Sequence, residues 1–165
     1  MQLFINQKLI SLKGRFFISD ANGNDVYEAQ GKVFALGRHL TLSDVQGHEL
    51  LKIRQKIVSL HHTYFITPTG GEEMELIQKI VSIKPHFYLN ALGWEISGGI
   101  TAHDYTIYKG EEIVAQISKQ WVAAASHYAI DITHDEDAVN VIGTVLALDC
   151  VNADNISSSA SSAST

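Results

Sequence analysis

The longest apolar run of the sequence lies near its carboxyl end, in EDAVNVIGTVLALDCVN (136–152). Thr133 and Glu136 have the spacing of a capping box, and the acidic residues at 135–137 suit the positive end of a helix dipole. The pattern therefore predicts an α-helix over 135–151. Its apolar residues cover nearly the whole circumference, and such a helix must be enclosed on all sides.

Protein, rather than lipid, is the expected enclosure of this helix. A bilayer-spanning helix needs about 20 apolar residues, and the run is too short and begins with too many acids. The alternative is two strands separated at Gly143, because valine and isoleucine also favour sheets.

The chain before this run reads as a series of β-hairpins. FFISDANGNDVYEAQGK (16–32) and LTLSDVQGHELLKIRQK (40–56) each place an Asp-x-x-Gly turn between alternating apolar residues. TPTGGEE (67–73) and YKGEE (108–112) are two further turns. In all four units a lysine follows the turn glycine by nine residues, which predicts a repeated strand–turn–strand unit that ends near a lysine. The pairs are Gly23/Lys32, Gly47/Lys56, Gly70/Lys79 and Gly110/Lys119.

A similarity between two distant segments of the chain indicates internal duplication. IRQKIVSLHHTYFI (53–66) aligns without gaps with ISKQWVAAASHYAI (117–130). The shared positions are Ile53/Ile117, Val58/Val122, Tyr64/Tyr128 and Ile66/Ile130.

The predicted fold class is mainly β: a closed antiparallel barrel of about twelve strands, between Gln2 and Ile132, that encloses the helix. Residues 1–152 form one domain, and the Ser/Ala-rich segment 153–165 is expected to be a disordered tail because it cannot bury apolar area.

Composition narrows the classes of function. The formal net charge is −6, which argues against non-specific nucleic-acid binding. The charge is uneven: residues 1–56 hold 8 Lys/Arg and 5 Asp/Glu (+3), whereas 57–165 hold 4 and 13 (−9). A single cysteine, Cys150, excludes an internal disulfide. No signal peptide is recognisable, so we expect a cytoplasmic protein, peripheral to a membrane if it binds one.

The most basic stretch supplies the candidate ligand-binding residues. Lys52, Arg54 and Lys56 alternate along a strand, so they project from one face, opposite Leu51, Ile53 and Ile57. They could bind a phosphate-bearing headgroup, with the arginine bonding in a bidentate manner. The plain alternative is a solvated strand face that charge keeps soluble. Lys32, Lys56, Lys79 and Lys119 would share one rim if all four hairpins point the same way, or lysine simply ends a duplicated strand.

Metal and catalytic sites are not expected. His61 and His62 face opposite sides of a strand, and capping accounts for the carboxylates beside His134, so no metal or other cofactor is predicted. No nucleophile elbow, P-loop or dinucleotide motif is present, and Cys150 has the apolar neighbours of an inert thiol. An enzyme would need a cleft lined by groups such as His103, Asp104 or His127. We therefore predict no catalytic residue.

The order and spacing of several motifs resemble the LURP-one-related (YxjI-type) family, which has a tubby-like fold and is related to phospholipid scramblases. The motifs are SDANGNDVYEAQGKVF, LTLSDVQGHELLKIRQKIVSLHHTYFI, IVAQISKQW and VIGTVLALD, within residues 12–150. The resemblance implies a barrel around a carboxy-terminal helix. It also implies lipid-related chemistry, since tubby proteins bind phosphoinositides through a basic surface and scramblases are associated with membranes.

The leading hypothesis is a non-enzymatic binding or scaffold module for an anionic phospholipid, a membrane surface or another phosphate-bearing ligand. Lys52, Arg54, Lys56, Lys32 and Lys119 would supply the charge. The alternative is a protein-interaction or oligomerisation module without a small-molecule ligand, which predicts an exposed apolar surface. The sequence leaves the oligomeric state open.

Overall fold

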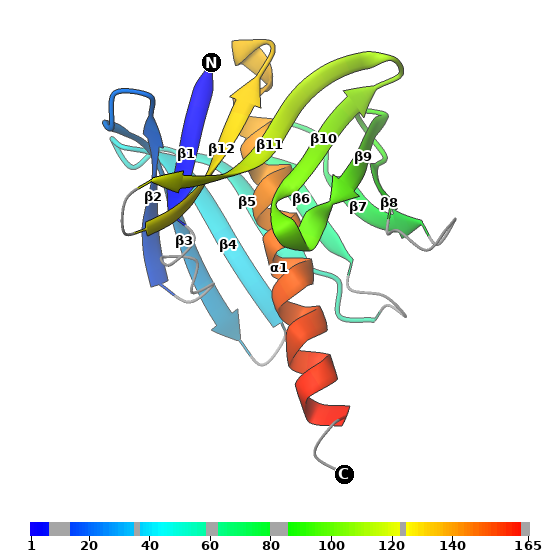
Figure 1. The fold of residues 1–165 in the computed structure, drawn as a ribbon. Coiled ribbons are helices and arrows are strands. Elements are labelled where there is room, and N and C mark those ends of the chain that lie inside the picture. Colours follow the sequence, from blue (N-terminus) through cyan, green and yellow to red (C-terminus); the bar gives the residue numbers. More distant parts are fainter. Residues whose placement is uncertain (7–13, 35–36, 59–62, 80–85, 123–124, 163–165) are drawn as a thin grey trace.

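A computed structural model describes residues 1–165 apart from 7–13, 35–36, 59–62, 80–85, 123–124 and 163–165. In the part of the chain that it describes, twelve antiparallel strands form one closed barrel around a single α-helix, which confirms the predicted architecture (Figure 1). The strands follow one another around the barrel in chain order, and β1 closes the ring against β12. They are β1 (Gln2–Asn6), β2 (Gly14–Asp20), β3 (Asp25–Phe34), β4 (Gly37–Asp44), β5 (Glu49–Gln55), β6 (Tyr64–Pro68), β7 (Met74–Lys79), β8 (His86–Leu89), β9 (Trp94–Gly99), β10 (Asp104–Lys109), β11 (Glu112–Val122) and β12 (Ala125–Ile132).

Side chains alternate between the lumen and the outside of the barrel. Phe16 and Ile18 of β2, like Leu40 and Leu42 of β4, are at most 2% exposed, as their alternation predicted. These inward residues and the helix form one continuous apolar core.

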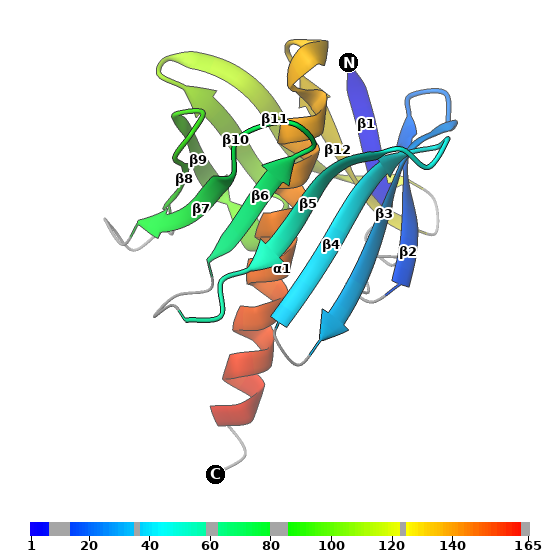
Figure 2. The same cartoon turned by 180° about the vertical axis from the view of Figure 1, so that it is seen from behind.

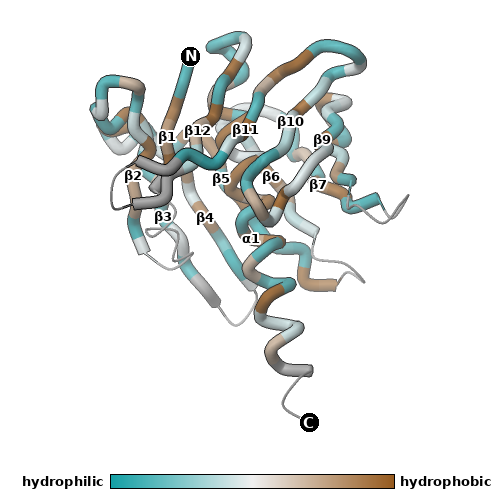
Figure 3. The backbone as a smooth tube through the Cα atoms, viewed as in Figure 1, coloured by the Kyte–Doolittle hydropathy of each residue, from teal (hydrophilic) through white to brown (hydrophobic). Residues whose placement is uncertain are grey.

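The helix α1 (Ala138–Ser162) runs through the barrel and follows a short 3-10 turn at Asp135–Asp137. Every residue from 141 to 151 is buried, a length of about 16 Å at 1.5 Å per residue. Figure 2 shows β4, β5 and β6 passing beside the helix from behind, and Figure 3 shows apolar positions along both the helix and the strands around it. The all-round apolar pattern thus has the protein enclosure it requires, and the alternative of two strands is wrong.

The predicted capping box is wrong. The hydroxyl of Thr133 donates a hydrogen bond to the carbonyl of Ile113 at 2.7 Å, so it ties the start of the helical segment to β11. His134 is the residue before the 3-10 turn, and its side chain makes no capping bond. The Thr133 hydroxyl therefore bonds the barrel wall instead of capping the helix.

The predicted helix end at 151 is also wrong, because α1 continues to Ser162. The hydroxyls of Ser157 and Ser158 donate to the carbonyls of Ala153 and Asp154 at 2.8 Å, one helical turn back. Asp154 itself is only 7% exposed. Residues 153–162 are therefore helical rather than disordered, and 163–165 lie outside the described residues.

The direction of the strands distinguishes the two ends of the barrel. Because neighbouring strands are antiparallel throughout, β3, β5, β7 and β11 all run in the same direction. The glycines of the preceding turns have positive φ of 83° (Gly23), 88° (Gly47), 75° (Gly70) and 61° (Gly110), which favours glycine. We call the end formed by these turns the turn rim, and the opposite end, where α1 leaves the barrel, the exit rim. The repeated unit is confirmed: Lys32, Lys56, Lys79 and Lys119 lie toward the exit rim.

Candidate functional site

The basic stretch lies on β5 and projects outward as predicted. Leu51 and Ile53 are buried, whereas the side chains of Lys52 and Arg54 are 63% and 46% exposed. Ile57 lies beyond the end of β5 and is 60% exposed, so its predicted inward placement is wrong. Side chains alternate between inward and outward positions only within the strand, and β5 ends at Gln55.

Each of the three cations on this stretch has a carboxylate partner: on β5 itself for Lys52, in the turn between β6 and β7 for Arg54, and on β7 for Lys56. The pairs are Lys52–Glu49 at 3.0 Å, Arg54–Glu73 at 3.2 Å and Lys56–Glu75 at 2.7 Å. Phe65 of β6 lies beneath two of these cations, with the Arg54 guanidinium 4.6 Å and the Lys56 ammonium 5.5 Å from its ring centre. The stretch is therefore compensated in charge, and exposed pairs of this kind add little stability.

A shallow groove of about 230 Å³ lies on the outside of β3, β4 and β5. Strand register brings its walls together, since Lys32 pairs with His39 and Thr41 with Lys52. Lys32 is exposed and has no carboxylate partner in the described part of the chain. We call this feature the basic groove, and its lining contains no aspartate or glutamate. The lining residues are Gln30, Lys32, His39, Leu40, Thr41, Lys52 and Ile53.

Lys119 does not belong to this groove. It lies on β11, opposite Tyr128 of β12, and the strands β12, β1 and β2 separate it from β3. Lys79 is on β7, where its ammonium lies 4.4 Å from the ring centre of Tyr88. The structure therefore brings Lys32 and Lys52 together and leaves Lys119 on another wall.

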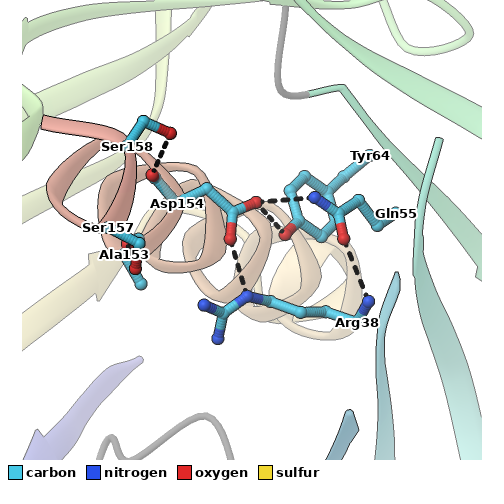
Figure 4. Close-up of polar contacts among 7 residues, drawn as sticks. All are labelled: Arg38, Gln55, Tyr64, Ala153, Asp154, Ser157 and Ser158. Carbon is cyan, nitrogen blue, oxygen red and sulfur yellow. Dashed lines mark hydrogen bonds and ion pairs between the residues drawn. The ribbon is translucent and has the colours of Figure 1, made fainter. Parts of the chain in front are cut away.

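A second polar feature surrounds α1 near the exit rim. The carboxylate of Asp154 accepts hydrogen bonds from Arg38 Nε at 2.7 Å, Gln55 Nε2 at 2.8 Å and the Tyr64 hydroxyl at 2.7 Å (Figure 4). The Gln55 amide oxygen in turn accepts from the backbone N–H of Arg38 at 3.0 Å. Burial, together with Cys150 and Asp154 nearby, raises the pKa of Tyr64. Asp154 thus ties the helix to β4, β5 and β6.

Asp149, one and a half turns earlier, ties the helix to the opposite wall. Its carboxylate accepts a hydrogen bond from the Tyr128 hydroxyl at 2.5 Å and lies 2.9 Å from Nε2 of His103. The His103 ring stacks on Tyr128 with ring centres 4.5 Å apart. His103 has a left-handed backbone, φ 52°, after the 3-10 turn Ile100–Ala102. We call Asp149, Asp154 and these partners the collar.

Two polar atoms near Asp149 are buried and have no hydrogen-bond partner among the residues that the structure describes: Nδ1 of His103 and the hydroxyl of Tyr105. Burial first, and Asp149 second, raise the pKa of both Tyr105 and Tyr128 far above that of a free tyrosine. Raised pKa values favour the protonated hydroxyls of Tyr105 and Tyr128, and Tyr128 donates its proton to Asp149.

The sequence analysis did not predict the collar, but its internal repeat aligned two of the collar residues, Tyr64 and Tyr128. These two tyrosines donate to Asp154 and Asp149 respectively. An aligned pair of tyrosines followed by two acids in an otherwise apolar helix was the available signal. Among the other candidates, Asp104 is exposed, and the side chains of His61, His62 and His127 lie outside the described residues.

Within the described residues no three potential metal ligands come together. His134 instead lies 3.0 Å from Glu112, which raises the pKa of that histidine. Burial raises the pKa of the Cys150 thiol, as its apolar neighbours suggested. Among these same residues, no helix has the length and hydropathy that crossing a bilayer requires.

Comparisons with known proteins show similarity along nearly the whole chain. The model of the LURP-one-related family matches residues 1–149. The uncharacterized protein YxjI of Bacillus subtilis (strain 168) is 31% identical over 151 residues, covering 92% of this chain and 93% of its own length. Protein LURP-one-related 15 of Arabidopsis thaliana is 24% identical over 174 residues, covering 92% and 80%. A crystal structure of an Arabidopsis thaliana protein shares the fold, with a TM-score of 0.60, 21% identity and coverage of 92% and 90%.

Proposed function

The chain belongs to the LURP-one-related family, and for this member of it we propose a non-enzymatic function: binding of a phosphate-bearing anion, such as a lipid headgroup, in the basic groove. The proposed setting is the cytoplasm.

The observation that carries this proposal is the chemistry of the groove lining. Lys32, His39 and Lys52, which also pairs with Glu49, supply cationic or N–H donors, and Thr41 and Gln30 supply neutral ones. The described lining residues include no carboxylate. Phosphate oxygens accept several such bonds at once, and those from charged donors are the strongest. The groove is shallow, so it suits a compact anion that reaches it from solvent or from a surface.

The rigidity of the wall also supports a binding function. Beneath the groove, Leu40 and Ile53 point into the packed core and are at most 1% exposed. Groups on sheet strands whose inner faces are packed hold their spacing better than groups on loops. The donors therefore need little reorganisation when an anion arrives.

Replacing Lys32 with alanine is expected to weaken anion binding by about 10- to 100-fold, because it removes a charge-assisted hydrogen bond worth about 1.5–3 kcal/mol. The measurement is a titration of isotopically labelled protein followed by amide chemical shifts. Soluble inositol phosphate and inorganic phosphate form two arms. Vesicles with phosphatidylglycerol form a third, read by flotation at low salt, and separate a headgroup in a bilayer from a free anion.

The matched control is Lys109→Ala, which removes an exposed lysine at the other end of the barrel. It should leave the affinity unchanged, and the shifts in the native protein should centre on β3 to β5. Saturable binding that Lys32→Ala leaves intact would place the anion elsewhere. If no arm shows binding, the proposal is wrong and the protein-interaction alternative becomes the better one.

A further inference from the structure

We propose that the exit rim docks onto an anionic lipid bilayer, with the turn rim directed away from it. This inference concerns the end of the barrel; it shares Lys32 with the basic groove but does not require that an anion binds in the groove.

Charge is distributed very unequally between the two ends. Lys109 is the one lysine or arginine side chain in the described segments of the turn rim. The acids of those segments are Asp20, Asp25, Asp44, Glu49, Glu72, Glu73, Glu111, Glu112, Asp135, Glu136 and Asp137. Three of these acids are paired, Glu49 with Lys52, Glu73 with Arg54 and Asp135 with the amino group of Met1, and the remaining acids leave this end negative. An anionic surface therefore repels this end, and the repulsion is greatest at low salt.

The described part of the exit rim lacks this excess of exposed acidic side chains. Asp149 and Asp154 are buried and bound in the collar, which leaves Asp104, at the start of β10, as the exposed acid in the described segments at this end. Lys32 and Lys79 add cationic charge that no described carboxylate compensates, and Lys56 is compensated by Glu75. An acidic protein with this distribution approaches an anionic surface with the exit rim first.

Exposed aliphatic side chains gather beside these lysines. Ile57 and Val58 directly follow Lys56 and are 60% and 89% exposed. Ile156 is 69% exposed and lies two residues past Asp154, whose carboxylate bonds Gln55 at the end of β5. Two residues correspond to about 200° around the helix, so Ile156 belongs to the exit rim like Ile57 and Val58 but points away from the face of α1 that bonds β5. Aliphatic side chains next to lysines gain from both the apolar boundary and the anionic headgroups of a bilayer.

The end of α1 fits the same surface. It projects from the exit rim beyond the strands (Figures 1 and 2), and its residues 155–160 are exposed. The sequence from Asn155 to Thr165 contains no charged side chain and many serines, so the opposition to anionic headgroups here is limited to the negative end of the helix dipole. Each lysine near an anionic surface contributes about 1 kcal/mol, so docking is weak, reversible and salt-sensitive.

Two valines at opposite ends of the barrel provide a matched test. Val58 lies at the exit rim and Val45, 47% exposed, lies in the turn between β4 and β5. Each is replaced with cysteine and labelled with an environment-sensitive fluorophore, since Cys150 is fully buried and does not compete. Vesicles of phosphatidylcholine with phosphatidylglycerol should shift the emission of the Val58→Cys label to the blue and leave the Val45→Cys label unchanged. Phosphatidylcholine alone, or high salt, should abolish the shift.

A second pair of variants tests the same contact without a label. Val58→Glu adds a carboxylate at the exit rim and should lower the vesicle-bound fraction about fivefold, whereas Val45→Glu should leave it unchanged. Equal effects of the two substitutions, or a shift at Val45→Cys, would overturn the orientation. Absence of binding to anionic vesicles overturns the docking itself and leaves a protein partner as the better occupant of Ile57, Val58 and Ile156. Anion binding in the groove would survive that result.

Discussion

Replacing Asp154 with alanine is expected to lower the free energy of unfolding by about 3–5 kcal/mol, because it leaves a largely buried guanidinium without its carboxylate. The side chains of Arg38 and Asp154 are 19% and 9% exposed. The substitution also removes the acceptor of the Tyr64 hydroxyl and the Gln55 amide. Urea unfolding followed by circular dichroism measures the loss.

Asn155→Ala is the control, since its side chain is exposed on the next position of the same helix. Its effect should stay within about 0.5 kcal/mol. Adding Arg38→Met to Asp154→Ala should recover part of the loss, because the unpaired charge is then gone. A loss below about 1 kcal/mol for Asp154→Ala would mean that the collar does not hold the helix in place.

Replacing Gly143 with valine is expected to cost about 1–3 kcal/mol or more, because the helix approaches the wall too closely there for a side chain. A Cβ at this position would lie 2.7 Å from Cδ2 of Leu51 on β5 and 3.1 Å from Cγ2 of Ile66 on β6. The same glycine that allowed an alternative of two strands is therefore a point of close packing between helix and barrel.

A double-mutant cycle identifies the clash. Leu51→Ala alone should cost about 2–5 kcal/mol, because it leaves a cavity beside the helix. In the Gly143→Val background the same change should cost much less, since the added methyl groups occupy that space. Strictly additive losses would show that Gly143 does not face Leu51 and would argue against the register of the helix in the lumen.

Much of the fold could be predicted because its signals are local or periodic. The apolar residues around the whole of α1 require enclosure, and the Asp-x-x-Gly turns recur with their lysines. In both Asp20 and Asp44 the carboxylate accepts backbone N–H bonds from positions two and four residues ahead, at 2.8–2.9 Å. Turn chemistry of this kind is set within a few residues, so sequence alone reveals it.

The errors share a cause, which is that a distant partner overrides a local preference. Thr133 fits a capping box but is bound to β11, and the serines after 152 suit a disordered tail but continue a helix that Asp154 anchors. The partners of Asp154 come from three strands far away in sequence. For the same reason Glu73 and Glu75, which pair with Arg54 and Lys56, could not be foreseen from the strand that carries these cations, whereas Glu49 precedes Lys52 by three residues on that strand.

The candidate site was predicted only in part. The repeat of glycine and lysine marked Lys32, but its proximity to Lys52 depends on the pairing of β3, β4 and β5. Lys119 shares the repeat and the end of the barrel, yet lies on another wall. The relation of this family to tubby proteins and phospholipid scramblases stays a prediction.

The reactivity of Cys150 tests most directly whether α1 fills a closed barrel. This cysteine lies on the helix, is fully buried, and its thiol has a pKa that burial raises. In native buffer we expect a thiol-reactive disulfide reagent to label it only as fast as the protein opens, so that labelling accelerates sharply through the urea transition. Labelling in native buffer at the rate of a cysteine in a short unfolded peptide would show that water reaches the helix and would contradict the account.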